Sequence, residues 1–116
     1  MLPREVRKYL FDIAQACELL TQFTKGKTLA DYAADPLLRS AVERQFEIIG
    51  EGLRQALSFD PSLSSRISDT QRIIAFRNRL IHGYASVSDE LVWGVVEASL
   101  PALCREVNAL LDEAAE

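Results

Sequence analysis

The chain has 116 residues, of which 48% are hydrophobic and 26% are charged, a balance typical of an ordinary soluble domain. A chain of this length is expected to fold as one domain, residues 1–116, and to bury roughly two-thirds of its unfolded surface without disulfides or metals. The net charge of −4 argues against a protein that coats DNA or RNA through a broad basic face. A local basic pocket is still possible, because four arginines lie close together in sequence, Arg66, Arg72, Arg77 and Arg79.

Apolar residues recur three and four positions apart through most of the chain, which predicts helices rather than strands. The first helix is expected over residues 4–24, where Lys25, Gly26 and Lys27 are typical of a helix C-terminus. Residues 28–34 are expected to form a short helix or an ordered turn.

A long helix is expected from residue 35 to about residue 58, since Asp35 suits the N-cap and Pro36 the first helical position. Two glycines, Gly50 and Gly52, lie inside it. Glycine within a helix is about 1 kcal/mol less favourable than alanine. Close packing against a neighbouring backbone would explain these glycines, and flexibility without a role is the alternative.

The composition of residues 58–66 predicts a loop. Ser68 or Asp69 can cap the helix that follows, which is expected to end near Ile81, with Gly83 as a natural stop.

Residues 86–90 predict the start of a last helix, because serines precede acidic residues there. Pro101 lies inside the apolar pattern of that helix and is expected to kink it. Four long helices with short connections predict an all-α fold, an antiparallel bundle of four to five helices.

Arg77 lies in the middle of an apolar stripe. Positions three and four apart share one face of a helix, and such positions around Arg77 hold Ile73, Ile74, Leu80 and Ile81. A charge there is costly to desolvate unless a partner or a ligand compensates it. The planar donors of arginine suit a phosphate or a carboxylate, so Arg77 is a candidate phosphate-binding residue.

His82 is the only histidine in the chain, and histidine is the side chain that most readily serves as acid or base near neutral pH. On an ideal helix His82 and Arg77 point about 140° apart. They can meet at one phosphate only if the helix unwinds near Ile81, which Gly83 would permit, or if a second subunit contributes.

Each of these residues also has a purely structural interpretation. Arg77 could form an internal ion pair with Glu51 or Glu47. His82 could be a buried histidine with a satisfied hydrogen bond, and Tyr84 could be a core aromatic with its hydroxyl at the rim.

No metal and no cofactor are expected. The chain has no glycine-rich phosphate loop, and one histidine with two remote cysteines, Cys17 and Cys104, does not make a zinc site. Both cysteines lie in apolar helical patterns, which predicts reduced core thiols rather than a redox pair. No apolar run approaches the ~20 residues of a membrane span and no signal peptide is visible, so a cytoplasmic protein is expected.

The segment from Arg77 to Tyr84 fits the pattern Arg-x4-His-x-Tyr, and through it the chain resembles the HEPN-domain ribonucleases. The fit is closest to the HepT-like toxins, which are paired with a minimal nucleotidyltransferase antitoxin of the MntA type. Three other segments resemble that family in the same order, residues 41–51, 92–93 and 100–103. The resemblance covers almost the whole chain.

The resemblance implies the toxin of a type VII-like HEPN/MNT toxin–antitoxin system, a metal-independent endoribonuclease that leaves a cyclic phosphate. His82 would act as general base or acid, and Arg77 would hold the phosphate and stabilise its extra charge. Asn78 would add a neutral hydrogen bond, with Arg79 and Tyr84 supporting the RNA. The family also implies a homodimer whose interface includes the helix that carries Arg77.

Tyr84 is implied as the site of control, because the partner antitoxin of such toxins transfers AMP units onto this tyrosine. The added phosphate and nucleoside would then lie beside Arg77, in the place that an RNA phosphate needs. The main alternative is a non-catalytic helical partner that docks the nucleotidyltransferase and binds nucleotide through Arg77. A purely structural bundle comes third.

Overall fold

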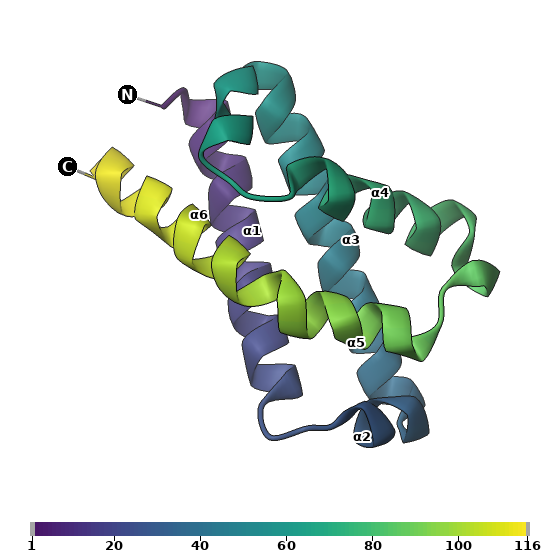
Figure 1. Ribbon diagram of the computed structural model, residues 1–116. Coiled ribbons are helices and arrows are strands. Elements are labelled where there is room, and N and C mark those ends of the chain that lie inside the picture. Colours follow the sequence, from purple (N-terminus) through teal and green to yellow (C-terminus); the bar gives the residue numbers. More distant parts are fainter. Residues whose placement is uncertain (1, 116) are drawn as a thin grey trace.

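Every regular element in the computed structural model is helical over residues 2–115, the part of the chain that the structure describes (Figure 1). The α-helices are α1 (Arg4–Thr24), α2 (Leu29–Ala34), α3 (Pro36–Phe59), α4 (Thr70–His82), α5 (Asp89–Ala98) and α6 (Leu100–Ala115). Two 3₁₀ helices, η1 (Pro61–Ser65) and η2 (Tyr84–Ser86), precede α4 and α5. The all-α fold expected from the sequence is confirmed, with α5 and α6 in place of a single last helix.

The helices form two layers. α1 and α3 run antiparallel and pack along their lengths, while α5 and α6 follow one another and cross this pair (Figure 1). α4 packs on α3, α6 packs on α1, and α2 closes one end of the molecule beside α5. The smallest dimension of the molecule is 19 Å, which corresponds to two helices of about 10 Å each.

Aromatic pairs fix two of the helix contacts in the core. Phe46 of α3 meets Phe76 of α4 edge-to-face, with ring centroids 5.2 Å apart. Tyr32 of α2 lies against Trp93 of α5 at 5.4 Å. Such pairs add about 0.5–1.5 kcal/mol to the burial of their apolar surface. The first pair holds the middle of α4 against α3.

The limits of the first three helices follow the sequence signals. α1 ends at Thr24, and Gly26 adopts the left-handed backbone (φ 71°) just beyond it. The segment 28–34 does form a helix, because Thr28 and Asp31 cap each other's backbone N–H groups. Asp35 accepts hydrogen bonds from two N–H groups in the first turn of α3, as expected for an N-cap.

The connection between α3 and α4 differs in detail from the expected loop and cap. Residues 61–65 form η1, with Asp60 accepting a hydrogen bond from the Ser62 N–H group. Asp69 holds the N-cap position of α4 in a left-handed conformation (φ 59°), and its side chain makes no capping bond. Ser68 instead donates to the carboxylate of Glu106 on α6, which ties the start of α4 to the other layer.

The last helix is interrupted at Ser99, two residues before Pro101. Proline lacks a backbone N–H group and its ring collides with the carbonyl four residues earlier, so it cannot continue a straight helix. Within the first turn of α6 the missing N–H group costs little, because those donors have no intrahelical partner in any helix. The expected kink is therefore present as a break between α5 and α6.

The two glycines of α3 serve contacts with two different helices, which confirms the packing explanation. A Cβ at Gly52 would lie 2.8 Å from Cγ1 of Ile13 on α1. A Cβ at Gly50 would lie 2.2 Å from Cβ of Arg77 on α4. Real Cβ atoms do not approach so closely, so α3 can touch both neighbours only because these positions have no side chain.

The two cysteines are free thiols and lie nearer to each other than their sequence separation suggests. Cys17 on α1 is buried and Cys104 on α6 is partly buried, and both line one groove between these helices. Over residues 2–115, no helix combines the length and the apolar character needed to cross a membrane.

Candidate active site

Arg77 projects from α4 onto α3, where the absence of a side chain at Gly50 makes room for it. The Arg77 side chain is 20% exposed, because the first carbons of its stem lie directly over Gly50. α4 turns its apolar face toward the core through Ile73, Phe76 and Leu80, and Arg77 stands at the margin of that face. The sequence placed Arg77 in the middle of an apolar stripe, and the structure moves it to the margin because Ile81 is exposed. The guanidinium group is partly desolvated, as expected.

Two neighbours hold the Arg77 guanidinium group. One Nη atom lies 3.0 Å from a carboxylate oxygen of Glu51, and the other donates to Oδ1 of Asn78 at 2.9 Å. The Nε atom is buried and has no hydrogen-bond partner within residues 2–115. Of the two internal ion pairs considered from the sequence, the one with Glu51 is present, whereas Glu47 pairs with Arg44. The guanidinium group is therefore held in one orientation, while its Nε–H group makes no hydrogen bond within the described residues.

Glu51 is itself held by a network on α3. Its carboxylate accepts hydrogen bonds from Arg54 at 2.8 and 3.2 Å and from Gln55 at 3.0 Å. These bonds, followed by the positive charges of Arg54 and Arg77, hold the pKa of the Glu51 carboxyl group below its usual value. Glu51 consequently remains ionised near neutral pH and keeps an anionic partner beside Arg77.

A pocket of about 260 Å³ opens beside this ion pair, between α1, α3 and α4. Its lining mixes charges of both signs with apolar side chains, namely Tyr9, Asp12, Arg44, Glu47, Ile48, Glu51, Gly52, Arg77 and Ile81. His82 does not line it. The pocket alone thus offers one held guanidinium group and no histidine.

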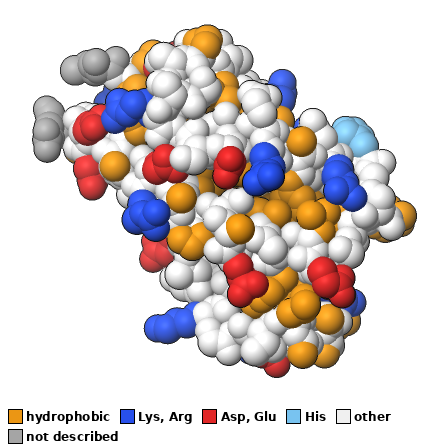
Figure 2. Space-filling view, viewed as in Figure 1, with side chains coloured by type: hydrophobic (Ala, Val, Ile, Leu, Met, Phe, Trp, Pro, Cys, Tyr) orange, Lys and Arg blue, Asp and Glu red, His pale blue; other side chains and the backbone are white. Residues whose placement is uncertain are grey.

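His82 is exposed at the last residue of α4 (pale blue in Figure 2). The helix continues without a break through Ile81 to His82, so it does not unwind in the way that would turn the two side chains together. At about 100° per residue, Arg77 and His82 point to different sides of α4. Unwinding of the helix near Ile81, one of the two arrangements considered from the sequence, is therefore absent from this structure. The exposure also excludes the interpretation of His82 as a buried structural histidine.

Tyr84 lies in the turn that follows α4, and a small hydrogen-bond network shapes this turn. Arg79 donates to the carbonyl oxygen of Ser86 at 2.8 Å, and the Ser86 hydroxyl group donates to the carbonyl oxygen of Gly83 at 2.7 Å. Tyr84 is 73% exposed, which excludes the core interpretation of this residue. Arg79 thus positions the segment that carries Tyr84, a role that the sequence did not indicate.

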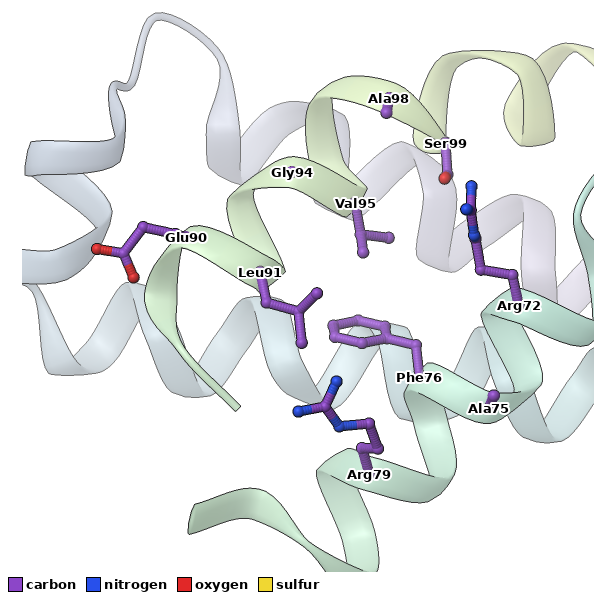
Figure 3. Close-up of a pocket in the computed structure, with 10 residues that line it drawn as sticks. All are labelled: Arg72, Ala75, Phe76, Arg79, Glu90, Leu91, Gly94, Val95, Ala98 and Ser99. Carbon is purple, nitrogen blue, oxygen red and sulfur yellow. The ribbon is translucent and has the colours of Figure 1, made fainter. Parts of the chain in front are cut away.

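A second hollow lies on the other side of α4, between α4 and α5, and sequence reasoning missed it (Figure 3). Its volume is about 440 Å³, and its lining consists of Arg72, Ala75, Phe76, Arg79, Glu90, Leu91, Gly94, Val95, Ala98 and Ser99. A signal was present in the sequence: Gly94 and Ala98 are small residues four apart, so one face of α5 lacks bulk. Across residues 2–115 no group of three or more histidine, cysteine or carboxylate side chains could hold a metal ion.

Comparisons with known proteins agree on one family. The family model described as Ribonuclease HepT-like matches residues 13–60 and 63–110. A putative RNase of Caldanaerobacter subterraneus subsp. tengcongensis is 32% identical over 92% of this chain and 95% of its own length. The probable ribonuclease HepT of Thermococcus cleftensis is 32% identical over 88% and 92%, and a putative RNase of Methanocaldococcus jannaschii is 30% identical over 93% and 98%. No solved structure matches the chain significantly.

Proposed function

The chain belongs to the ribonuclease HepT-like family, and from this premise we propose that it is a metal-independent endoribonuclease and the toxin of a type VII-like HEPN/MNT toxin–antitoxin pair. The observation that carries the proposal is the contrast along α4. The Arg77 guanidinium group is held and partly desolvated, while the His82 imidazole ring is exposed. A group that binds a phosphate benefits from being held in place, and a group that moves a proton must reach the substrate.

In the proposed reaction His82 takes the proton from the 2′-hydroxyl group of the RNA. The 2′-oxygen then attacks the adjacent phosphorus, the bond to the 5′-oxygen breaks, and that oxygen leaves with a proton from water. The products are a 2′,3′-cyclic phosphate and a free 5′-hydroxyl group. Arg77 stabilises the extra negative charge on the five-coordinate phosphorus, and Asn78 keeps the guanidinium group in orientation.

The enzyme is proposed to act as a homodimer with α4 at the interface. Arg77 and His82 point to different sides of α4 within one protomer, and this divergence supports a site in which Arg77 of one subunit meets His82 of the other. Two features support this arrangement. Ile81, between them in sequence, is 39% exposed and lines the Arg77 pocket, and the Nε atom of Arg77 lacks a partner within residues 2–115.

Mixed dimers test the proposal directly. Arg77→Ala and His82→Ala alone should each cleave RNA about 10²–10⁴-fold more slowly than the wild type, because each homodimer lacks one group at both sites. A heterodimer of the two variants should regain one complete site, since one protomer supplies Arg77 and the other supplies His82. We expect roughly half of the wild-type activity from purified heterodimers. Inactive heterodimers would show that no site combines Arg77 of one subunit with His82 of the other. A wild-type protein that does not cleave RNA would contradict the ribonuclease function.

Tyr84 is proposed as the residue through which an MntA-type nucleotidyltransferase inactivates the toxin. Its exposure of 73% gives a modifying enzyme access to the hydroxyl group. AMP attached there would add a negative charge and a nucleoside at the proposed RNA site, in the place that an RNA phosphate needs. Intact-mass spectra of the protein co-expressed with the nucleotidyltransferase should show added AMP masses, which Tyr84→Phe removes. An inhibited but unmodified protein would point to steric neutralisation instead.

One observation favours the alternative of a non-catalytic docking subunit. In the single protomer Arg77 is already paired with Glu51, and the pocket beside it does not include His82. This alternative requires that wild type, His82→Ala and Arg77→Ala have the same effect on growth when the partner is absent. Growth arrest by the wild type alone would support the enzyme, and no arrest by any of the three would support the docking subunit.

A further inference from the structure

The hollow between α4 and α5 has an apolar floor and an open mouth. Figure 3 shows the ring of Phe76 pointing from α4 toward Leu91 and Val95 on α5, with these three side chains converging in the cavity. The volume of about 440 Å³ lies within the range of about 300–1,000 Å³ typical of small-ligand pockets. Figure 2 shows the same region as an apolar area, with basic groups along its α4 edge and acidic groups along its α5 edge.

The α4 side of the rim is positive, and Glu90 on α5 is the one acidic residue in the lining. Arg72 and Arg79 are seven residues apart on α4, which places them on one face about 10.5 Å apart along the helix axis. Arg79 donates only to neutral oxygen atoms of Ser86, and neither Arg79 nor Arg72 has an ion-pair partner within residues 2–115. The carboxylate of Glu90 points away from the cavity in Figure 3.

α4 carries a net positive charge, whereas the chain as a whole is negatively charged. α4 contains three arginines and neither aspartate nor glutamate, although the chain has a net charge of −4. Two of these three arginines, Arg72 and Arg79, flank the hollow. An anionic occupant with a flat apolar part matches both the rim and the floor.

We propose that this hollow receives one unpaired base of a single-stranded RNA, with Arg72 and Arg79 on the phosphates at either side of that base. Proteins that bind single strands combine cationic groups along the backbone with apolar or aromatic surfaces under the bases. In a double-stranded RNA the bases are stacked and paired, so none can enter a pocket of this kind. The proposal rests on the ribonuclease function and specifies its substrate class as single-stranded RNA.

The hollow is close to the catalytic end of α4. Arg79 and His82 are three residues apart, which corresponds to about 4.5 Å along the helix axis. Arg79 also positions the turn that carries Tyr84, through its bond to Ser86. A base in the hollow would therefore belong to a nucleotide within a few positions of the cleaved phosphate, and the pocket would influence where the RNA is cut.

Gly94 provides a test that fills the hollow without disturbing the core. Gly94 is exposed in the middle of α5, and an added Cβ would meet no atom within 4 Å. Gly94→Leu should extend its side chain over the apolar floor, whereas Gly94→Ala makes the same gain in helix propensity and leaves most of the space open. The probe is a short 2′-O-methyl oligoribonucleotide, which cannot be cleaved, measured by fluorescence anisotropy against the full-length protein. We expect Gly94→Leu to weaken binding about tenfold or more and Gly94→Ala to leave it unchanged.

Arg72→Gln tests the charge at the rim. Loss of one phosphate contact should reduce the slope of log affinity against log salt by about 0.7 for a single strand. Arg7→Gln is the matched control, because it makes the same charge change on α1, which contributes nothing to the hollow. Circular dichroism of each variant establishes that it is folded, and Arg72→Gln remains informative if Gly94→Leu fails to fold.

The outcomes separate this proposal from the proposed function. If the wild type cleaves RNA, and Gly94→Leu and Arg72→Gln bind the probe as the wild type does, the base pocket is wrong and the ribonuclease stands. If the wild type neither binds nor cleaves RNA, both the base pocket and the ribonuclease function are wrong. If Gly94→Leu binds RNA normally but dissociates the dimer, or escapes the nucleotidyltransferase, the hollow is a protein interface and the proposal is overturned.

Discussion

Arginine side chains lie on two sides of α4, in very different surroundings. On the side that faces α3, Arg77 is pressed over Gly50, paired with Glu51 and bonded to Asn78. On the side that faces α5, Arg72 and Arg79 flank an open hollow. A fixed guanidinium group can favour one transition state, because its donors need no reorganisation during the reaction. Cations on an open surface attract any phosphate backbone. One short helix thus separates the proposed chemistry from the proposed substrate binding.

The largest expected effect is on the rate of RNA cleavage, and it distinguishes the proposed catalytic residues from the proposed binding surface. His82→Ala and Arg77→Ala should each reduce RNA cleavage by about 10²–10⁴-fold, which is the range for a positioned acid–base or a charge-stabilising group. Arg72→Gln should mainly raise KM. Steady-state cleavage of a defined RNA measures both effects. Cleavage by His82→Ala at the wild-type rate would remove this residue from the site.

The next effect concerns the packing that holds Arg77. Gly50→Ala should lower the free energy of unfolding by about 1–3 kcal/mol, because the new Cβ would collide with the stem of Arg77 close to the backbone of α4. Urea denaturation measures the loss, and RNA cleavage should fall with it. Gly52→Ala is the matched control. It meets the side chain of Ile13 on α1, so it should cost less stability and leave cleavage by the folded protein intact. Equal cleavage by the two folded variants would contradict the special role of Gly50.

A smaller effect is expected from the partner of Arg77. Glu51→Gln should reduce cleavage roughly tenfold or less, since a neutral amide orients Arg77 less firmly. It should change the free energy of unfolding by no more than about 1 kcal/mol, because the pair is partly exposed. Glu47→Gln, in the same pocket, is the control.

The pH dependence of the Glu51 contribution has a definite sign. The pKa of the folded carboxyl group is lowered, so its contribution to stability is present above the unfolded pKa and is lost as pH falls through the folded pKa. Wild type and Glu51→Gln should therefore differ by a constant amount from neutral pH down to about pH 5 and converge only in stronger acid. Convergence already at pH 6 would contradict this assignment.

The smallest effect is local to the turn at Tyr84. Arg79→Gln should remove the bond to Ser86 and leave global stability within about 0.5 kcal/mol of the wild type, because the contact is exposed. Amide hydrogen exchange at residues 84–87 should become faster, while exchange in the core of α3 stays the same. Unchanged exchange in the turn would mean that Arg79 does not position Tyr84.

The local chemistry of the chain was sufficient to predict the helices and most of their limits. The capping signals at Thr28 and Asp35 and the apolar period of three and four act between near neighbours, so they can be read without a fold. The apolar neighbours of Arg77 three and four positions away likewise predicted a partly desolvated guanidinium group. The prediction for Asp69 was only partly correct, because Asp69 holds the N-cap position of α4 but its side chain makes no capping hydrogen bond.

Only the tertiary structure decided which residues meet across helices. It paired Arg77 with Glu51, turned Gly50 toward α4 and Gly52 toward α1, and opened a hollow between α4 and α5. The sequence by itself determined the helices, the family and the candidate residues of α4, because these depend on spacing along one chain. Contacts between helices depend on how apolar faces and small residues fit together over the whole molecule, and no local pattern contains that information.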